Sequence, residues 1–209
     1  MSDDLGFNIT VIAPPPPRHY PPGAAKSHCG NQPDLEGCVP SYVLAGSRGA
    51  VIDCGASATS VPTAHDSGGE RGLYLMGAVR FYGRGFEIRN CRARDGAAVY
   101  FDRTAWSDPT GATSTGLFLE VVTLTDNKAS NDGGAVWVSR EASFAHVTAT
   151  GSYAGGNGGA LFLEAPQAAT RPYELMASVL AGGEAIFGNG GLVHGAGELT
   201  VGGGVTGAS

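Results

Sequence analysis

Short apolar runs separated by turn-forming residues dominate the chain from about residue 41 onward. Several runs alternate apolar and polar positions, as in Phe86-Glu87-Ile88-Arg89. Most are about four to eight residues long and are bounded by Gly, Asn, Asp or Ser, which is typical of short β-strands joined by tight turns. No long stretch shows a helical period with caps, although 174–180 is ambiguous. The pattern predicts an all-β fold.

Residues 1–40 have a different composition from the rest. They contain Pro14-Pro15-Pro16-Pro17 and Pro21-Pro22-Gly23, and proline-rich chain favours extended or irregular structure. We therefore expect an irregular N-terminal segment or cap over 1–40, followed by a repeat domain over 41–209. The alternative for the first segment is a proline-rich ligand for an SH3-type groove.

The apolar runs belong to a repeated unit of strand, turn, glycine and strand. Asp95-Gly96 matches Asp132-Gly133, and the same alignment sets Asn90 opposite Asn127 and Asp53 opposite Asn90. Copies recur at intervals of about 25–37 residues, a spacing that indicates a solenoid. The repeat residues expected to be structural are Asn90, Asn127, Gly96, Gly133, Gly134, Gly158, Gly159, Gly190 and Gly191.

The variable spacing favours a parallel β-solenoid over other repeat architectures. An α-solenoid would show helical periodicity, and a propeller blade would need about 40–45 residues. In a parallel solenoid the connecting loops can vary, and 55–71 and 102–116 are expected to be such loops. The repeated aromatic and aliphatic positions would stack in the interior. The amides of Asn90 and Asn127 would bond to each other at a shared turn.

Two short motifs that recur in register resemble those of a known family. Asn-x-Ala followed by Gly-Gly-Ala and a branched aliphatic residue is similar to the repeat of polymorphic outer membrane proteins. The matching segments are Leu124-Thr125-Asp126-Asn127-Lys128-Ala129, with Leu for the family's Phe, Gly133-Gly134-Ala135-Val136 and Gly158-Gly159-Ala160-Leu161. The resemblance covers 85–165 well and 41–200 loosely. It implies a right-handed parallel β-helix of the pectin-lyase-like superfamily, for which we expect about five or six coils here.

Composition and charge narrow the function classes. Gly supplies 34 of 209 residues and charged residues only 15%, which argues against a disordered chain or a helical bundle. The formal net charge of −6 argues against a nucleic-acid partner. No apolar run reaches the ~18 residues that a membrane-spanning helix needs.

We expect an extracellular or cell-surface location. Met1 to Thr10 begins with acids and lacks the features of a secretory signal, so any targeting signal would lie outside this chain. The tail from Val201 to Ser209 ends without a sequence feature that would cap the repeats, so we expect the chain to be a fragment. If the C-terminal end of the solenoid is open, we expect end-to-end self-association or a continuation of the chain.

The four cysteines, Cys29, Cys38, Cys54 and Cys91, show no zinc-type spacing. Cys29 and Cys38 could close a short loop, whereas Cys54 and Cys91 end two similar strands and could stack or pair. Four cysteines allow three connectivities, and sequence alone does not choose among them. We predict no metal site and no cofactor.

Asp95 and Asp132 are the best candidates for a catalytic pair. The repeat places them at one position of successive coils, about 4.8 Å apart, and a glycosidase needs two carboxyl groups within about 5–10 Å. Both lie in Asp-Gly turns, where Asp is favoured for its bonds to the backbone. A turn role is the preferred interpretation.

Ligand binding has four candidate residues: Trp106, Arg92, Arg94 and Arg103. Trp106 lies in a loop and could stack on a sugar ring, while the arginines could bind an acidic glycan or simply form a solvated face. We predict a non-catalytic surface or adhesin-like module, structural or ligand-displaying, with a glycan or a cell-surface protein as partner. The alternative is a β-helical polysaccharide lyase or glycoside hydrolase, or a truncated part of one.

Overall fold

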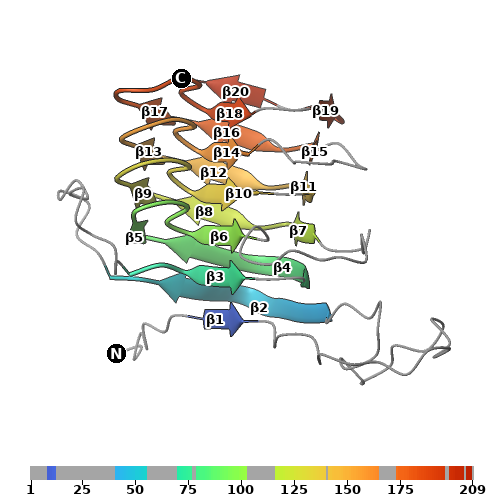
Figure 1. The fold of residues 1–209 in the computed structure, drawn as a ribbon. Coiled ribbons are helices and arrows are strands. Elements are labelled where there is room, and N and C mark those ends of the chain that lie inside the picture. The colour runs from blue at the N-terminus through green and yellow to red at the C-terminus, as the bar shows by residue number, and fades with distance from the viewer. Residues whose placement is uncertain are drawn as a thin grey trace, which may run out of the picture.

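A computed structural model of the chain describes residues 9–12, 41–55, 70–76, 79–102, 116–139, 141–164, 173–195, 198–204 and 206–208. Within these ranges the backbone forms twenty short β-strands and no helix. Figure 1 shows the strands stacked from β1 near one end of the molecule to β20 at the other. The predicted all-β class is confirmed.

The strands form three sheets whose paired neighbours run parallel. The six-stranded sheet A consists of β1 (Ile9–Ile12), β3 (Leu73–Met76), β6 (Val99–Asp102), β10 (Val136–Val138), β14 (Leu161–Leu163) and β18 (Val193–Gly195). The ten-stranded sheet B consists of β2 (Ser41–Asp53), β4 (Arg80–Arg89), β7 (Gly116–Glu120), β8 (Thr123–Thr125), β11 (Ala142–Ala145), β12 (Thr148–Thr150), β15 (Tyr173–Met176), β16 (Val179–Ala181), β19 (Leu199–Gly202) and β20 (Thr206–Ala208). The four-stranded sheet C consists of β5 (Arg92–Ala93), β9 (Lys128–Ala129), β13 (Tyr153–Ala154) and β17 (Glu184–Ala185).

Successive passages of the chain visit the sheets in the same order, and each such passage is called a level below. Residues 116–138 run through β7, β8, β9 and β10, and residues 142–163 run through β11, β12, β13 and β14. Each strand of the second level pairs in parallel with its counterpart in the first. This order, with parallel stacking, is consistent with a β-solenoid.

The period-two pattern of the sequence separates the core from the surface. Inward positions are fully or almost fully buried, among them Leu73, Leu75, Phe81, Ile88, Phe101, Leu117, Leu119, Leu124, Phe144, Leu161 and Leu163. Burying each such side chain stabilises the fold by roughly 1.5–3 kcal/mol. The expectation that the aromatic positions stack in the interior is wrong for Tyr100 and Phe162, because adjacent residues of a strand point to opposite faces. Val99 and Phe101 fill the core, and Tyr100 projects outward.

Left-handed residues turn the chain between strands at equivalent places on each level. Gly96, Gly133, Gly158 and Gly190 have φ values of 53°, 66°, 65° and 71°, and backbone hydrogen bonds link each turn to the next. At Gly133 a Cβ atom would collide with the carbonyl oxygen of Val136. These turns therefore need glycine both for conformation and for space.

The first segment contributes to the sheet despite its proline content. Strand β1 lies within the predicted irregular segment 1–40 and pairs with β3 at the edge of sheet A. The proline runs and most of the expected loops 55–71 and 102–116 lie outside the described residues. Within the part that the structure describes, no helix is long and apolar enough to span a membrane.

Candidate functional site

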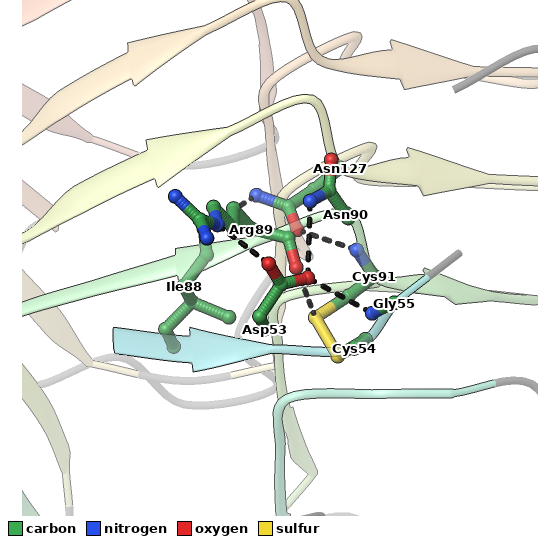
Figure 2. Close-up of polar contacts among 8 residues, drawn as sticks. All are labelled: Asp53, Cys54, Gly55, Ile88, Arg89, Asn90, Cys91 and Asn127. Atoms are coloured by element: carbon green, nitrogen blue, oxygen red, sulfur yellow. Dashed lines mark hydrogen bonds and ion pairs between the residues drawn. A yellow bond between two sulfur atoms is a disulfide. The ribbon is translucent and has the colours of Figure 1, made fainter. Parts of the chain in front are cut away.

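The turn that follows β2 holds a cluster of polar side chains around Asp53 (Figure 2). Its carboxylate accepts hydrogen bonds from Arg89 Nε at 2.7 Å, Asn90 Nδ2 at 3.0 Å and the Gly55 backbone N–H at 2.9 Å. Burial alone would raise the pKa of Asp53, but these three donors and the charge of Arg89 outweigh it and lower the pKa. Asp53 is therefore a bonded turn residue.

A disulfide joins this turn to the next level. Cys54 and Cys91 are bonded, with their Cα atoms 4.8 Å apart, and Figure 2 shows the bridge beside Asp53. The sequence left open whether Cys54 and Cys91 pair, and the structure shows that they do. Cys29 and Cys38, expected to close a short loop, lie outside the described residues.

Asn127 bridges two levels from a fully buried position. Its Nδ2 donates to the carbonyl oxygen of Ile88 at 3.1 Å, and its Oδ1 accepts from the backbone N–H of Cys91 at 3.1 Å. One side chain thus gives the Cys91 N–H its partner and adds a bond to the carbonyl of Ile88, which lies within the β4–β8 ladder. The predicted structural role of Asn127 has a clear physical basis here.

The prediction that the amides of Asn90 and Asn127 bond to each other is wrong, because the strands pair one residue away from the predicted register. The structure pairs Arg92 with Lys128 and Arg89 with Thr125, so Cys91 lies opposite Asn127, and Asn90 lies opposite Asp126. The segment from 129 to 133 is one residue longer than its counterpart from 93 to 96. Alignment on the shared Asp-Gly pair therefore displaced everything before it. Asp53 likewise lies opposite Arg89, although it still accepts a bond from Asn90.

The two candidate catalytic carboxylates lie at neighbouring turns and serve the backbone. Asp95 Oδ1 accepts from the backbone N–H of Asp132 at 3.2 Å, and Asp132 Oδ1 accepts from that of Asn157 at 2.6 Å. Asn157 Oδ1 repeats the contact with the N–H of Asn189 at 2.9 Å. These four residues form an Asp/Asn ladder, in which the side chains of Asp95, Asp132 and Asn157 each accept a bond from the next turn.

Asn131 is a member of this cluster that the sequence reasoning missed. Its Nδ2 donates to Asp95 Oδ1 at 2.8 Å and to Asp132 Oδ2 at 3.3 Å, so one amide bridges both carboxylates. The residue precedes the repeated Asp-Gly pair, and its place in the inserted segment could have pointed to it. Because their oxygens accept bonds from neighbouring turns, Asp95 and Asp132 are placed as turn acceptors.

Cationic side chains gather on the outer face of sheet C and the adjoining turn. Arg92 lies in register with Lys128 on the neighbouring strand, and Arg94 follows two residues later with 64% of its side chain exposed. Among the described residues, the Arg92 Nη2 atom is buried without a hydrogen-bond partner, and Arg92 forms no ion pair. Arg94 lies 3.7 Å from Asp95. We call Arg92, Lys128 and Arg94 the cationic strip; Trp106 and Arg103, the other two predicted ligand contacts, lie outside the described residues.

An aromatic column runs along the outer face of sheet A. Its members are Tyr74, Tyr100, Trp137, Phe162 and His194, with successive ring centroids 5.3, 4.6, 6.4 and 5.4 Å apart and nearly parallel planes. The rings stack on one another from strand to strand across sheet A, so their faces are already covered and chiefly their edges meet solvent. This column stabilises the sheet and offers little face for a sugar.

Arg71 anchors the first end of the aromatic column. Its guanidinium lies 4.9 Å from the ring centroid of Tyr74 and 4.8 Å from that of Tyr100, and it donates to the carbonyl oxygens of Asp95 and Gly96. These are cation–π contacts combined with backbone bonds. Arg71 therefore ties sheet A to the turn that carries Asp95.

A second pair of carboxylates lies beside the aromatic column. Strand register places Asp102, Ser139 and Glu164 at one equivalent position of three successive levels, where Asp102 and Ser139 are buried and Glu164 is partly exposed. Asp102 Oδ1 lies 3.3 Å from Ser139 Oγ, and Tyr100 Oη donates to Asp102 Oδ2 at 3.2 Å. Burial, and secondarily the charges of Asp102 and Asp132, raise the pKa of Glu164. These three residues are far apart in sequence and are brought to one column only by strand pairing.

Comparison with protein-family models, curated proteins and solved structures finds no match for the chain. Within the described residues, no group of three or more His, Cys, Asp or Glu side chains is arranged to hold a metal ion.

Proposed function

We propose that the chain is a non-catalytic, ligand-displaying module of the extracellular space or cell surface, and that the cationic strip binds an acidic glycan. The observation that carries the proposal is Arg92, which lies in register with Lys128 and has no ion pair among the described residues. A guanidinium without a carboxylate partner can donate hydrogen bonds to a carboxylate or sulfate of a ligand that reaches it. Arg94 would extend the contact, and Trp106 and Arg103, which lie outside the described residues, remain the other predicted ligand contacts.

The finer architecture belongs to the same proposal. A right-handed parallel β-helix of about five or six coils, with repeats of the polymorphic outer membrane protein type, would make a stiff rod that holds the strip in a fixed geometry. The recurrent strand order and the glycine turns at 96, 133, 158 and 190 support it. The fixed side-chain spacing lowers the entropic cost of binding a repetitive ligand.

A glycan array that includes polyuronates, sulfated chains and neutral chains tests the binding proposal. We expect binding to acidic chains that weakens with added salt and is lost in Arg92→Ala. Arg84→Ala is the matched control, because Arg84 is an exposed arginine on sheet B, paired with Glu120. Absence of binding to every acidic chain, or equal loss in both variants, would overturn the proposal.

A β-helical glycoside hydrolase or lyase is the second candidate, and the Asp102–Ser139–Glu164 column favours it. The two carboxylates lie two levels apart, about 10 Å between backbone positions, near the range of carboxyl separations in inverting hydrolases. Glu164, with its raised pKa, would act as the acid. A reducing-end and unsaturated-product screen tests this candidate: turnover lost in Glu164→Gln but kept in Glu174→Gln, an exposed glutamate on sheet B, would replace the non-catalytic proposal.

A further inference from the structure

The outer face of sheet B carries a regular array of uncharged side chains over strands β8, β12, β16 and β20. The outward positions on these strands alternate with buried ones. Their described members are Thr123 and Thr125, Thr148 and Thr150, Val179 and Ala181, and Thr206. We call these seven residues the threonine face.

Strand register makes the threonine face a rectangular lattice. Thr148 lies opposite Thr123 and Thr150 opposite Thr125, and the next two strands continue the alignment without a register shift. Neighbouring strands are about 4.8 Å apart and alternate residues about 6.7 Å apart along a strand. Figure 1 shows β8, β12, β16 and β20 as successive rungs of one stack.

Absence of charge distinguishes this face from neighbouring surfaces. The lattice ends at β4, where Glu87 and Arg89 occupy the equivalent positions. Elsewhere on sheet B, Arg84 and Glu120 are exposed, and sheet C carries Lys128 and Glu184 in one column. The high strand propensity of threonine explains single outward threonines, but it does not explain why charged residues are missing from all seven positions.

Most side chains of the threonine face are also stiff. Thr and Val are branched at Cβ and have restricted χ1 rotation, and Ala has no rotamer to fix. The methyl and hydroxyl groups are therefore held in a fixed two-dimensional pattern before any ligand arrives. A surface of this kind can hold water at regular positions with little further loss of side-chain entropy.

We propose that the threonine face binds ice. Its two repeats are close to the repeats between water oxygens on faces of hexagonal ice, so the ordered water above the lattice could merge with a growing crystal. The methyl groups favour removal from liquid water, and the hydroxyl groups keep hydrogen-bonded contact with the crystal. The proposal concerns a different face from the cationic strip and does not depend on glycan binding.

Thermal hysteresis and ice shaping of the purified chain, measured by nanolitre osmometry, test the proposal. We expect a faceted crystal and a gap between melting and freezing points that grows with protein concentration. Thr148→Tyr, at the centre of the lattice, should lose most of this gap, and Thr148→Lys should do the same by adding a charge. Ser143→Tyr is the control, because Ser143 is partly exposed on the adjoining strand β11, outside the threonine face.

Each outcome decides the proposal. A wild-type chain that neither shapes ice nor separates its freezing and melting points overturns it, as does an equal loss in the Thr148 and Ser143 variants. Circular dichroism confirms that the variants are folded, and the lysine variant replaces the tyrosine variant if the latter unfolds. Sedimentation detects the competing use of the face, since self-association abolished by Thr148→Lys without ice activity would assign it to a second copy of the chain. Glycan binding in the absence of ice activity would leave the proposed function standing.

Discussion

Replacing the buried Asn127 by alanine should be one of the most destabilising single substitutions of a polar residue in this fold. The side chain is fully buried and bonds two backbone groups of the preceding level, the carbonyl of Ile88 and the N–H of Cys91. Alanine would keep the local backbone but remove both partners. The Cys91 N–H would then be buried and unsatisfied, and the Ile88 carbonyl would keep only its bond within the β4–β8 ladder.

The magnitude follows from those two contacts. Leaving a buried donor without a partner costs about 1–3 kcal/mol, and losing one further hydrogen bond costs about 0.5–1.5 kcal/mol, so the two contacts predict a loss of roughly 1.5–4.5 kcal/mol in the free energy of unfolding. A domain of ordinary stability has about 5–15 kcal/mol in total. The variant should therefore unfold at clearly lower urea concentration, with an unchanged slope.

Urea unfolding of the disulfide-bonded protein, followed by the fluorescence of Trp137 and Trp106, measures the effect. Asn131→Ala is the control, since it removes exposed contacts of the same amide type and should cost less than about 1 kcal/mol. Asn127→Asp keeps an acceptor for Cys91 but offers no donor to Ile88, so it should also be destabilising. If Asn127→Ala costs no more than Asn131→Ala, the reasoning about buried backbone partners is refuted.

Four further predictions concern turns and charged groups. Val121 is half-exposed with φ 54°, and because a left-handed L-residue costs about 1–2 kcal/mol, Val121→Gly should raise the melting temperature; an unchanged or lower value would contradict this. Gly133→Ala should lower the free energy of unfolding by about 2–5 kcal/mol, because it combines a left-handed conformation with overpacking. Gly204→Ala is the control, since Gly204 has φ 77° and open space around it, and it should cost only about 1–2 kcal/mol. Equal losses in unfolding experiments would exclude a role for the collision with Val136. The pKa of Asp53 is lowered on folding. Its contribution to stability is therefore present above its usual pKa near 3.8 and is lost as the pH falls through its pKa in the folded state. Asp53→Asn should accordingly flatten the acid limb of the curve of stability against pH. The pKa of Glu164 is raised on folding, so its contribution to stability is present at low pH and is lost as the pH rises through its pKa in the folded state. Glu164→Gln should therefore stabilise the protein at pH 7 relative to wild type. A curve of stability against pH that neither Asp53→Asn nor Glu164→Gln changes would count against these assignments.

The sequence predicted the strands well because their determinants are local. Alternation of apolar and polar residues decides which face of a strand is buried, and this pattern can be counted without knowing the partner strand. Glycine turns at 96, 133, 158 and 190 were also accessible, since a left-handed turn that excludes a Cβ atom leaves the same residue in each copy. An all-β chain with stacked repeats followed from these two features alone.

Register could not be obtained in the same way, because it depends on the length of every turn between paired strands. One extra residue between 129 and 133 was enough to place Asn127 opposite Cys91 instead of Asn90. The same limit hid the Asp102–Ser139–Glu164 column and Asn131, whose members are distant in sequence and meet only through pairing. It also hid Arg71, whose contacts with Tyr74 and Tyr100 require the edge of sheet A to be in place.

By itself, then, the sequence determined the kind of element, the inward and outward positions and the turns that require glycine, because each depends on neighbours along the chain. Tertiary structure decided which polar side chains meet: Asp95 and Asp132 are joined to the backbone of the next turn, and Thr123 and Thr148 are set in one lattice. The physical reason is that parallel stacking brings together residues some 25–40 positions apart, at a spacing fixed by interstrand hydrogen bonds and not by any local preference.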